Sequence, residues 1–217
     1  MVSILIKKVI DIEKPGKTVE KILTAARAAF AENGYSGTHM SEIALHARVN
    51  KATLYYQIGD KDTLYANVIH QVIGNIAQNI AQAVANANGP EEKIHAYINT
   101  IVEAVDKNPE IPSIMMREVA SGGATMPRVV LEDIASILTI VAGVPEEGRK
   151  KRVFIETVPF LIHMMVMGTI LFYKKAMLIK DRHSWLPVSI KAHDKKLKAS
   201  LGDEMANLVL KAIKRDQ

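Results

Sequence analysis

Apolar residues recur every four positions over one long stretch of this sequence, at Leu64, Val68, Val72, Ile76, Ile80 and Val84. An α-helix has about 3.6 residues per turn, so this spacing places the side chains along one helical face. Asp60 is a suitable cap for such a helix, and the Asn-Gly-Pro sequence at 88–90 is a suitable stop. The predicted helix is too long for a small N-terminal bundle, so it must leave that bundle and continue into a second helical region.

The helical pattern continues through most of the remaining chain, and signals for β-strands are scarce. Further helices are predicted over residues 18–34, 40–47, 51–58, 90–108, 111–120, 127–144, 146–179 and 203–215. Residues 180–200 interrupt the periodicity, so a mobile loop is predicted there. The 217 residues are 48% hydrophobic and 24% charged, which is enough to bury a sizeable core. The predicted fold class is all-α.

Two short helices, 40–47 and 51–58, are separated by a brief turn and preceded by a longer helix, as in a helix-turn-helix unit. In the second of them, Leu54 and Ile58 are four residues apart and share the inward face. Asn50 can cap its N-terminus. A helix of this size fits the major groove of B-DNA, which is about 12 Å wide.

Tyr55 and Tyr56 are adjacent in the second short helix, so they lie about 100° apart around its axis. At least one of them must therefore point away from the core. A tyrosine hydroxyl can donate to a DNA phosphate, and Lys51 and Lys61 supply positive charge at either end of the helix. On these features alone, half-buried tyrosines on the surface of an ordinary bundle are an equally good interpretation.

Two segments carry a family resemblance, "ILTAARAAFAENGYSGTHMSEIA" and "VNKATLYYQIGDKDTLYANVI". The most telling parts are the Gly34-Tyr35 turn, the "TLYY" sequence, and the Lys-x-x-Leu spacing from Lys61 to Leu64. Through these motifs, residues 18–69 resemble the DNA-binding domain of the TetR family of bacterial transcriptional regulators. The resemblance implies an N-terminal three-helix helix-turn-helix DNA-binding domain joined to a larger helical ligand-binding and dimerisation domain.

The resemblance also implies which residues contact double-stranded DNA: Thr38, His39, Ser41, Lys51, Ala52, Thr53, Tyr55, Tyr56, Gln57 and Lys61. Gln57 replaces a frequent histidine but keeps hydrogen-bonding ability, and Asn50 replaces a frequent serine but remains a good cap. Arg48 stands where the turn commonly has glycine. If the backbone is left-handed there, arginine costs roughly 1 kcal/mol relative to glycine.

The predicted organisation is an N-terminal arm at 1–17, a helix-turn-helix domain at 18–62 and an effector-binding and dimerisation domain at 63–217. The arm could be a strand, a basic segment touching DNA or an unstructured tail, and the tail is the preferred interpretation. The implied function is a ligand-responsive transcriptional regulator, most simply a repressor that binds a palindromic operator as a homodimer. The alternative is an all-helical small-molecule binding protein or enzyme that no longer binds DNA.

Adaptable sulfur-containing and aromatic side chains in the C-terminal region suggest an effector that is an apolar or aromatic small molecule. The candidate ligand-binding residues are Met115, Met116, Glu118, Phe160, His163, Met164 and Met167. Glu118 and Glu156 could orient a polar ligand group, or could pair with Arg117 and Arg152. An ordinary core position is the preferred interpretation of any single member of the set.

A dimer surface is expected in the C-terminal region, because two-fold symmetric operators require a two-fold symmetric protein. The candidate residues are Phe154, Gly168, Phe172, Met205, Leu208, Val209 and Ile213. The last four are proposed to form an apolar stripe on the otherwise charged helix 203–215, and Gly168 would permit close approach of a partner helix.

Composition excludes several other classes of protein. The chain has no cysteine, so disulfides and thiolate metal sites are excluded, which fits the reducing cytoplasm. A net charge of +5 suits an anionic partner without requiring one. No cofactor motif, metal-ligand spacing or nucleophile-base pair is found, so no enzyme activity is predicted. The apolar run 154–173 contains Glu156, Pro159 and His163, and a buried helix is predicted rather than a membrane span.

Overall fold

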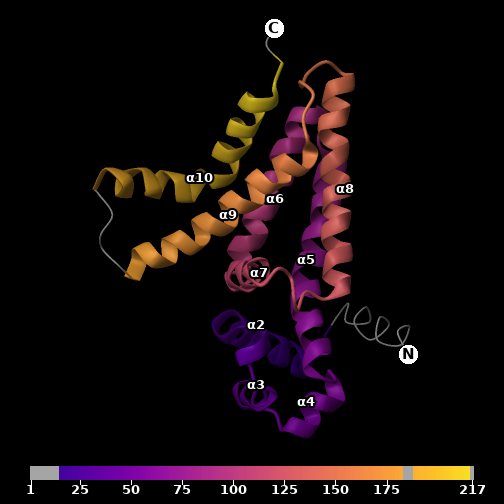
Figure 1. The fold of residues 1–217 in the computed structure, drawn as a ribbon, viewed down its shortest axis with the longest axis vertical. Coiled ribbons are helices and arrows are strands. Elements are labelled where there is room, and N and C mark those ends of the chain that lie inside the picture. The colour runs from indigo at the N-terminus through magenta and orange to yellow at the C-terminus, as the bar shows by residue number, and fades with distance from the viewer. Residues whose placement is uncertain (1–14, 183–187, 216–217) are drawn as a thin grey trace. The chain divides into compact units, whose positions relative to one another are not determined.

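The computed structural model of the protein describes residues 15–182 and 188–215. Over these residues helices follow one another with short connections (Figure 1). They are α2 (Lys17–Gly37), α3 (Met40–His46), α4 (Lys51–Gln57), α5 (Lys61–Asn86), α6 (Gly89–Lys107), α7 (Ile111–Ala120), α8 (Arg128–Lys150), α9 (Pro159–Arg182) and α10 (Val188–Ile213). Among the described residues the β-structure is limited to an isolated bridge between Phe154 and Lys214. The predicted all-α fold class is confirmed.

The chain forms two compact units, each built from separate stretches of sequence. The first unit contains the described residues up to Asn75 together with Asn108–Asp133. The second contains Ile76–Lys107 together with the described residues from Ile134 onward. The helix α5 contributes residues to both units, as its length requires. The predicted functional domains, 18–62 and 63–217, follow a different division and stay a prediction, and most of the predicted arm lies outside the described residues.

In the first unit, α2, α3 and α4 gather around the first turns of α5 (Figure 1). Every residue of α5 from Thr63 to Ile69 is buried, although a helix presents all its faces over two turns. The helix α7 completes the packing against α2, where the Arg117 guanidinium donates to the Glu32 carbonyl at 2.6 Å. The helix α2 therefore packs against α5, through Phe30 and Tyr65, and also against α7.

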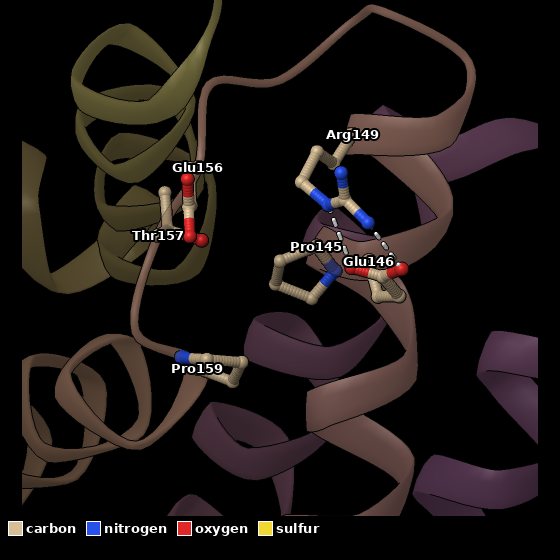
Figure 2. Close-up of a pocket in the computed structure, with 6 residues that line it drawn as sticks. All are labelled: Pro145, Glu146, Arg149, Glu156, Thr157 and Pro159. Atoms are coloured by element: carbon tan, nitrogen blue, oxygen red, sulfur yellow. Dashed lines mark hydrogen bonds and ion pairs between the residues drawn. The ribbon is translucent and has the colours of Figure 1, made fainter.

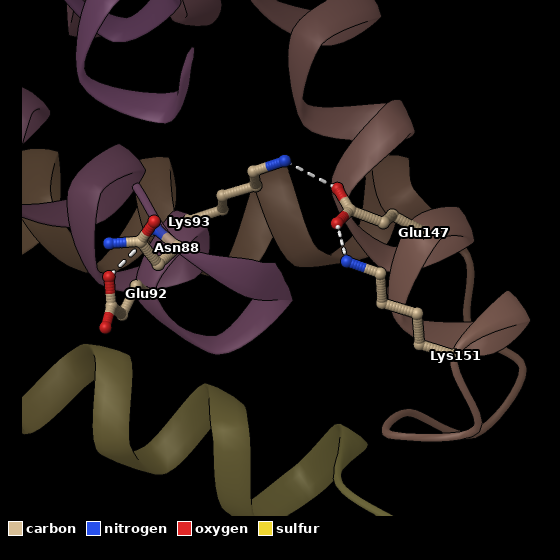
Figure 3. A network of polar contacts seen from close by, with 5 residues as sticks. All are labelled: Asn88, Glu92, Lys93, Glu147 and Lys151. Carbon is tan, nitrogen blue, oxygen red and sulfur yellow. Dashed lines mark hydrogen bonds and ion pairs between the residues drawn. The ribbon is translucent and has the colours of Figure 1, made fainter. Parts of the chain in front are cut away.

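In the second unit, α6 packs closely against α10. A Cβ atom on Gly202 would lie 1.9 Å from Oδ1 of Asn99, so the observed spacing depends on glycine. The other side of α6 is tied to α8 through Lys93, which contacts Glu147 at 2.6 Å, and Lys151 contacts the same carboxylate at 2.7 Å (Figure 3). Hydrogen bonds from Lys151 and Lys93 hold the pKa of Glu147 below its usual value.

The predicted helix 146–179 needs correction. The helix α8 continues through Pro145 to Lys150, and residues 151–158 separate it from α9. Arg152 has a left-handed φ of 59°, which ends the helical path. Pro159 then occupies the first position of α9, where a missing backbone N–H carries no penalty. Pro145 therefore lies within α8 although the predicted helices end and begin on either side of it, and Pro159 begins α9 although it was predicted to lie inside a helix.

The loop predicted over residues 180–200 also needs correction. The helix α9 extends to Arg182 and α10 begins at Val188, while residues 183–187 lie outside the described residues. The sequence from Ile190 to Ala199 contains neither glycine nor proline and is rich in lysine and alanine, which favour helix even without a clear apolar face. The irregularity that remains is a kink at Ser200, with φ −130° and ψ 21°.

The buried helix predicted from the run 154–173 is also not what the structure shows. Only 28% of the segment Pro159–Ile179 is buried, and it is the one helix among the described residues with the length and apolar character to cross a membrane. Length and composition alone are weak evidence for a membrane span, since core helices share them. The feature that distinguishes α9 is its exposed apolar face, which includes Phe160, Met164 and Phe172.

Candidate nucleic-acid interface

The helix α4 has one buried and one exposed face. The Asn50 side chain accepts the backbone N–H of Thr53 at 2.7 Å, which confirms the predicted cap. Leu54 is 0% exposed, whereas the adjacent Tyr55 and Tyr56 are 50% and 82% exposed. Hydrophobic burial of Leu54 therefore fixes the rotation of the helix, and both tyrosines point outward.

The turn before α4 has a left-handed backbone at Arg48, the conformation for which the sequence predicts a cost. Arg48 has a φ of 57°, so the backbone is left-handed where relatives of this motif commonly have glycine. The backbone N–H of Val49 donates to the Ala44 carbonyl at 3.0 Å, which closes the end of α3. A strain of roughly 1 kcal/mol at Arg48 is offset by this packed turn.

Most of the predicted DNA-contacting side chains are accessible. His39, Ser41, Lys51, Ala52, Tyr55, Tyr56 and Gln57 are exposed, and Thr53 and Lys61 are half-buried. They come from the start of α3, from α4 and from the first turn of α5. Such an outward-facing group of hydroxyl, amide and ammonium groups can donate to phosphates and to base edges.

Thr38 is the exception, because its side chain is fully buried. Its hydroxyl lies 2.7 Å from the Gly34 carbonyl and 3.1 Å from the Ala29 carbonyl. Gly34 has φ 71°, which interrupts the regular path of α2 just before Thr38. The side chain of Thr38 therefore stabilises the end of α2, and its assignment as a DNA contact needs correction.

An aromatic cluster behind the interface was not identified from the sequence. The ring of Tyr35 lies 5.1 Å from that of Tyr65 and 6.4 Å from that of Phe30, and the Tyr35 hydroxyl donates to Asp62. The hydrogen bond to Asp62 raises the pKa of Tyr35 to about 12, so the hydroxyl keeps its proton at neutral pH. The Gly-Tyr turn signalled Tyr35 as a motif residue, but only the fold shows that it touches Asp62.

Residues 22–68 match the family described as bacterial regulatory proteins, tetR family. The HTH-type transcriptional repressor NicS of Pseudomonas putida is 22% identical over 209 residues, which cover 94% of this chain and 95% of NicS. Among solved structures, the ketosteroid regulator KstR2 of Mycobacterium tuberculosis superposes with a TM-score of 0.71 at 17% identity, covering 94% of this chain and 98% of that one. FadR of Bacillus subtilis in complex with stearoyl-CoA gives 0.68 at 18% identity, covering 88% and 97%.

The capped, outward-facing α4 on a helical scaffold defines a helix-turn-helix DNA-binding transcriptional regulator. The full-length similarity to a repressor agrees with this class. Residues 22–68 therefore carry the DNA-binding domain of the TetR family, and the chain is similar over nearly its whole length to an HTH-type repressor. Members of this family are DNA-binding regulators and not enzymes, so the alternative of an all-helical small-molecule binding protein or enzyme that no longer binds DNA is set aside.

The predicted ligand-binding residues fall into two separate groups. In the first unit, Met115 and Glu118 on α7 are buried and Met116 is half-buried. The Glu118 carboxylate accepts the Tyr65 hydroxyl at 2.6 Å, while its second oxygen is buried without a hydrogen-bond partner among the described residues. The expected pairing with Arg117 does not occur, because Arg117 donates to the Glu32 carbonyl.

In the second unit, α9 carries the other candidates. Phe160 and Met164 are exposed, Met167 is half-buried and His163 is buried. The Tyr97 hydroxyl lies 2.7 Å from Nδ1 of His163. Burial lowers the pKa of His163, so the ring shares this hydrogen bond in its neutral form. His163 is therefore a hydrogen-bonded core residue, as the sequence favoured for a lone histidine on an apolar helix.

A pocket of about 370 Å³ at the end of α8 contains none of these candidates. Its lining residues are Pro145, Glu146, Arg149, Glu156, Thr157 and Pro159 (Figure 2). The Arg149 guanidinium donates to both oxygens of Glu146, at 2.9 and 2.8 Å, so these two charges already compensate each other. Over residues 15–182 and 188–215, no group of three or more histidine and acidic side chains could hold a metal ion.

The predicted dimer residues differ in accessibility. Phe154, Met205, Val209 and Ile213 are at most 7% exposed within the single chain, because they pack into the core of the second unit. Their assignment to a dimer surface needs correction. Phe172 and Leu208 are 68% and 65% exposed, and a Cβ on Gly168 would have nothing within 4 Å. Of the seven predicted dimer residues, these three are therefore the ones that a partner could contact.

Proposed function

We propose that this regulator is a homodimeric, ligand-responsive repressor that binds a palindromic operator with two copies of α4. The observation that carries the proposal is the division of α4 into a buried Leu54 and an exposed Tyr55–Tyr56 pair. One short helix contacts few base pairs, so two helices related by a two-fold axis would double the recognised sequence. The proposed DNA-facing residues are His39, Ser41, Lys51, Ala52, Thr53, Tyr55, Tyr56, Gln57 and Lys61.

The proposed dimer surface follows from the exposed face of α9. Its members are Phe160, Leu161, Met164, Met165, Gly168 and Phe172. They recur at helical spacing along one face, while Ile162 and Val166 on the opposite face are buried in the same chain. The exposed apolar residues of α9 lie on one face, and the other face packs against the rest of the same chain. One exposed apolar face is the pattern expected of a helix that packs against one further protein surface. A second copy of the chain, with Leu208 of α10 at the edge of the contact, is the occupant that the stripe fits.

The dimer is tested by sedimentation of the wild type and of Phe172→Glu and Leu208→Glu. Each variant buries a charge in the proposed interface, so both should shift the protein towards monomer and weaken operator binding. Leu131→Glu is the matched control, since Leu131 is 53% exposed on α8 but belongs to the first unit and is not a member of the proposed surface. A monomeric wild type that binds a palindrome tightly would contradict the proposal.

The proposed effector is an apolar or aromatic small molecule. FadR of Bacillus subtilis has been solved with stearoyl-CoA, and KstR2 is named as a ketosteroid regulator, so apolar ligands occur among proteins of similar fold. Met115 and Met116 of α7 and Met167 of α9 lie outside the proposed dimer surface and supply adaptable apolar side chains. Calorimetric titration with stearoyl-CoA and with a ketosteroid, followed by operator-binding measurements, tests this class. Failure of both probes to bind would contradict it.

The proposed site of action is the bacterial cytoplasm, where the operator DNA is found. The match of residues 22–68 to a family of bacterial transcriptional regulators supports this location. The absence of cysteine from the sequence is compatible with a reducing compartment. Fractionation of cells that express the full chain, followed by immunodetection, tests the location.

A further inference from the structure

Lys61 is flanked in the sequence by two carboxylates, Asp60 and Asp62, either of which could neutralise its ammonium group. The structure gives both carboxylates other partners. Asp60 caps α5 by accepting the Thr63 backbone N–H at 2.8 Å. Asp62 accepts the hydroxyl of Tyr35. Lys61 forms no ion pair with any residue that the structure describes, so no carboxylate among residues 15–182 and 188–215 compensates its charge.

Tyr35 also contacts Lys61 directly. The Lys61 ammonium lies 4.5 Å from the centroid of the Tyr35 ring, which is within the range of a cation–π interaction. Such an interaction orients an ammonium group without cancelling its charge, unlike a pair with a carboxylate. Tyr35 is therefore in contact with the lysine through its ring and with the competing carboxylate through its hydroxyl.

The position of the Tyr35 ring is fixed by the core of the first unit. It stacks on Phe30 with an interplanar angle of 9° and meets the Tyr65 ring edge-on at 63°. Tyr65 is held in turn by Glu118, to which its hydroxyl donates at 2.6 Å. The three rings come from α2 and α5, and the last hydrogen bond comes from α7. The Tyr35 ring, over which the Lys61 ammonium lies, therefore has a fixed orientation.

We propose that Tyr35 is a positioning residue for DNA binding, whose hydroxyl keeps Asp62 away from Lys61 and whose ring presents the ammonium group to a DNA phosphate. The inference rests on the proposed contact between Lys61 and DNA. A tyrosine hydroxyl is protonated at neutral pH, and the hydrogen bond to Asp62 raises the pKa of Tyr35 further, to about 12, so the hydroxyl remains a donor to Asp62. Tyr35 itself need not touch DNA.

The test uses the full chain and an operator selected by the wild type from random duplex DNA. Tyr35→Phe keeps the ring but releases Asp62, which can then pair with Lys61. Operator binding should weaken about fivefold, the scale of one solvent-exposed ion pair. The slope of log affinity against log salt should fall by up to about 0.9 per recognition helix, as for one lost phosphate contact. Thermal unfolding of each variant verifies that it is folded.

Rescue by a second substitution separates positioning from a purely structural role. Asp62→Asn removes the competing charge, so Tyr35→Phe combined with Asp62→Asn should recover the affinity and salt slope of Asp62→Asn alone. In a Lys61→Met background, Tyr35→Phe should have no further effect on binding. This non-additivity is expected only if Tyr35 acts through Lys61.

Two failures are distinguishable. If Lys61→Met leaves the affinity and the salt slope unchanged, the proposed contact of Lys61 with DNA is wrong, and the positioning role with it. If Lys61→Met weakens binding but Tyr35→Phe does not, or if Asp62→Asn does not rescue Tyr35→Phe, the positioning role alone is overturned.

Discussion

Thr38 and Ser41 lie three residues apart, and both carry a hydroxyl group that could serve a DNA phosphate. Only Ser41 is exposed, because the hydroxyl of Thr38 is turned inward to the Gly34 carbonyl at 2.7 Å. A family pattern assigns both positions to the interface, since it records sequence position and not side-chain direction. Substitutions at the two positions should therefore have different consequences.

Thr38→Val replaces the buried hydroxyl by a methyl group of similar size and leaves a buried carbonyl without its donor. The free energy of unfolding should fall by about 1 to 2 kcal/mol, while the folded variant keeps its operator affinity. Ser41→Ala is the matched control, which should change stability by less than about 0.5 kcal/mol. Denaturant unfolding and operator titration of both variants check this, and a stable Thr38→Val with weakened DNA binding would restore Thr38 to the interface.

His163 gives a second residue-scale prediction, in pH dependence. Its pKa is lowered by burial, whereas the unfolded histidine titrates near about pH 6.5. Below that pH the unfolded chain binds more protons than the folded chain, so the free energy of unfolding should decrease as pH falls from about 6.5 towards the folded pKa. His163→Asn, whose amide oxygen can still accept from Tyr97, should remove this part of the slope. Identical slopes for the wild type and the variant between about pH 5 and 7 would contradict the prediction.

At the scale of elements, two glycines of α8 should respond oppositely to alanine. A Cβ on Gly148 would lie 2.1 Å from the ring of the buried Phe154, whereas a Cβ on Gly143 would meet nothing within 4 Å. Gly148→Ala should destabilise the protein by about 1 to 3 kcal/mol through overpacking. Gly143→Ala should stabilise it by about 0.5 to 1 kcal/mol, because alanine favours helix. Thermal unfolding of the pair checks this, and the same sign for both would show that the backbone relaxes around Gly148.

The elements also show how far the sequence could predict the structure. Caps and periodicity predicted α4 and α5, because Asn50, Asp60 and the residues around them determine local geometry. The C-terminus of α8 and the N-terminus of α9 were predicted wrongly. Proline occurs inside α8, at Pro145, and also at the first position of α9, at Pro159, so the residue type alone does not show where a helix ends. The burial of α9 was also predicted wrongly. Apolar composition indicates that a helix packs against another surface. It does not indicate whether that surface belongs to the same chain or to a partner.

At the scale of the whole molecule, residues distant in sequence contact one another behind the proposed DNA-binding surface. In the first unit, Tyr35 of α2 donates to Asp62 of α5. The neighbouring ring of Tyr65 belongs to α5, and its hydroxyl donates to Glu118 of α7. No periodicity or short motif encodes such contacts, so the sequence could predict a set of DNA-facing residues but not the side chains packed behind them. The same reason explains why the dimer stripe was assigned to Met205 and Val209, which the fold buries.

The central claim is that α4 binds operator DNA through its exposed tyrosines while its leucine belongs to the core. It is tested most directly by titrating the selected operator and a scrambled duplex with the wild type, Tyr56→Ala and Leu54→Ala at several salt concentrations. Tyr56→Ala should unfold at the wild-type temperature and bind the operator about tenfold more weakly, as for one lost base-edge contact. Leu54→Ala should lose about 2 to 5 kcal/mol of stability. If Tyr56→Ala binds the operator as tightly as the wild type, or if it loses as much stability as Leu54→Ala, the account of this interface is wrong.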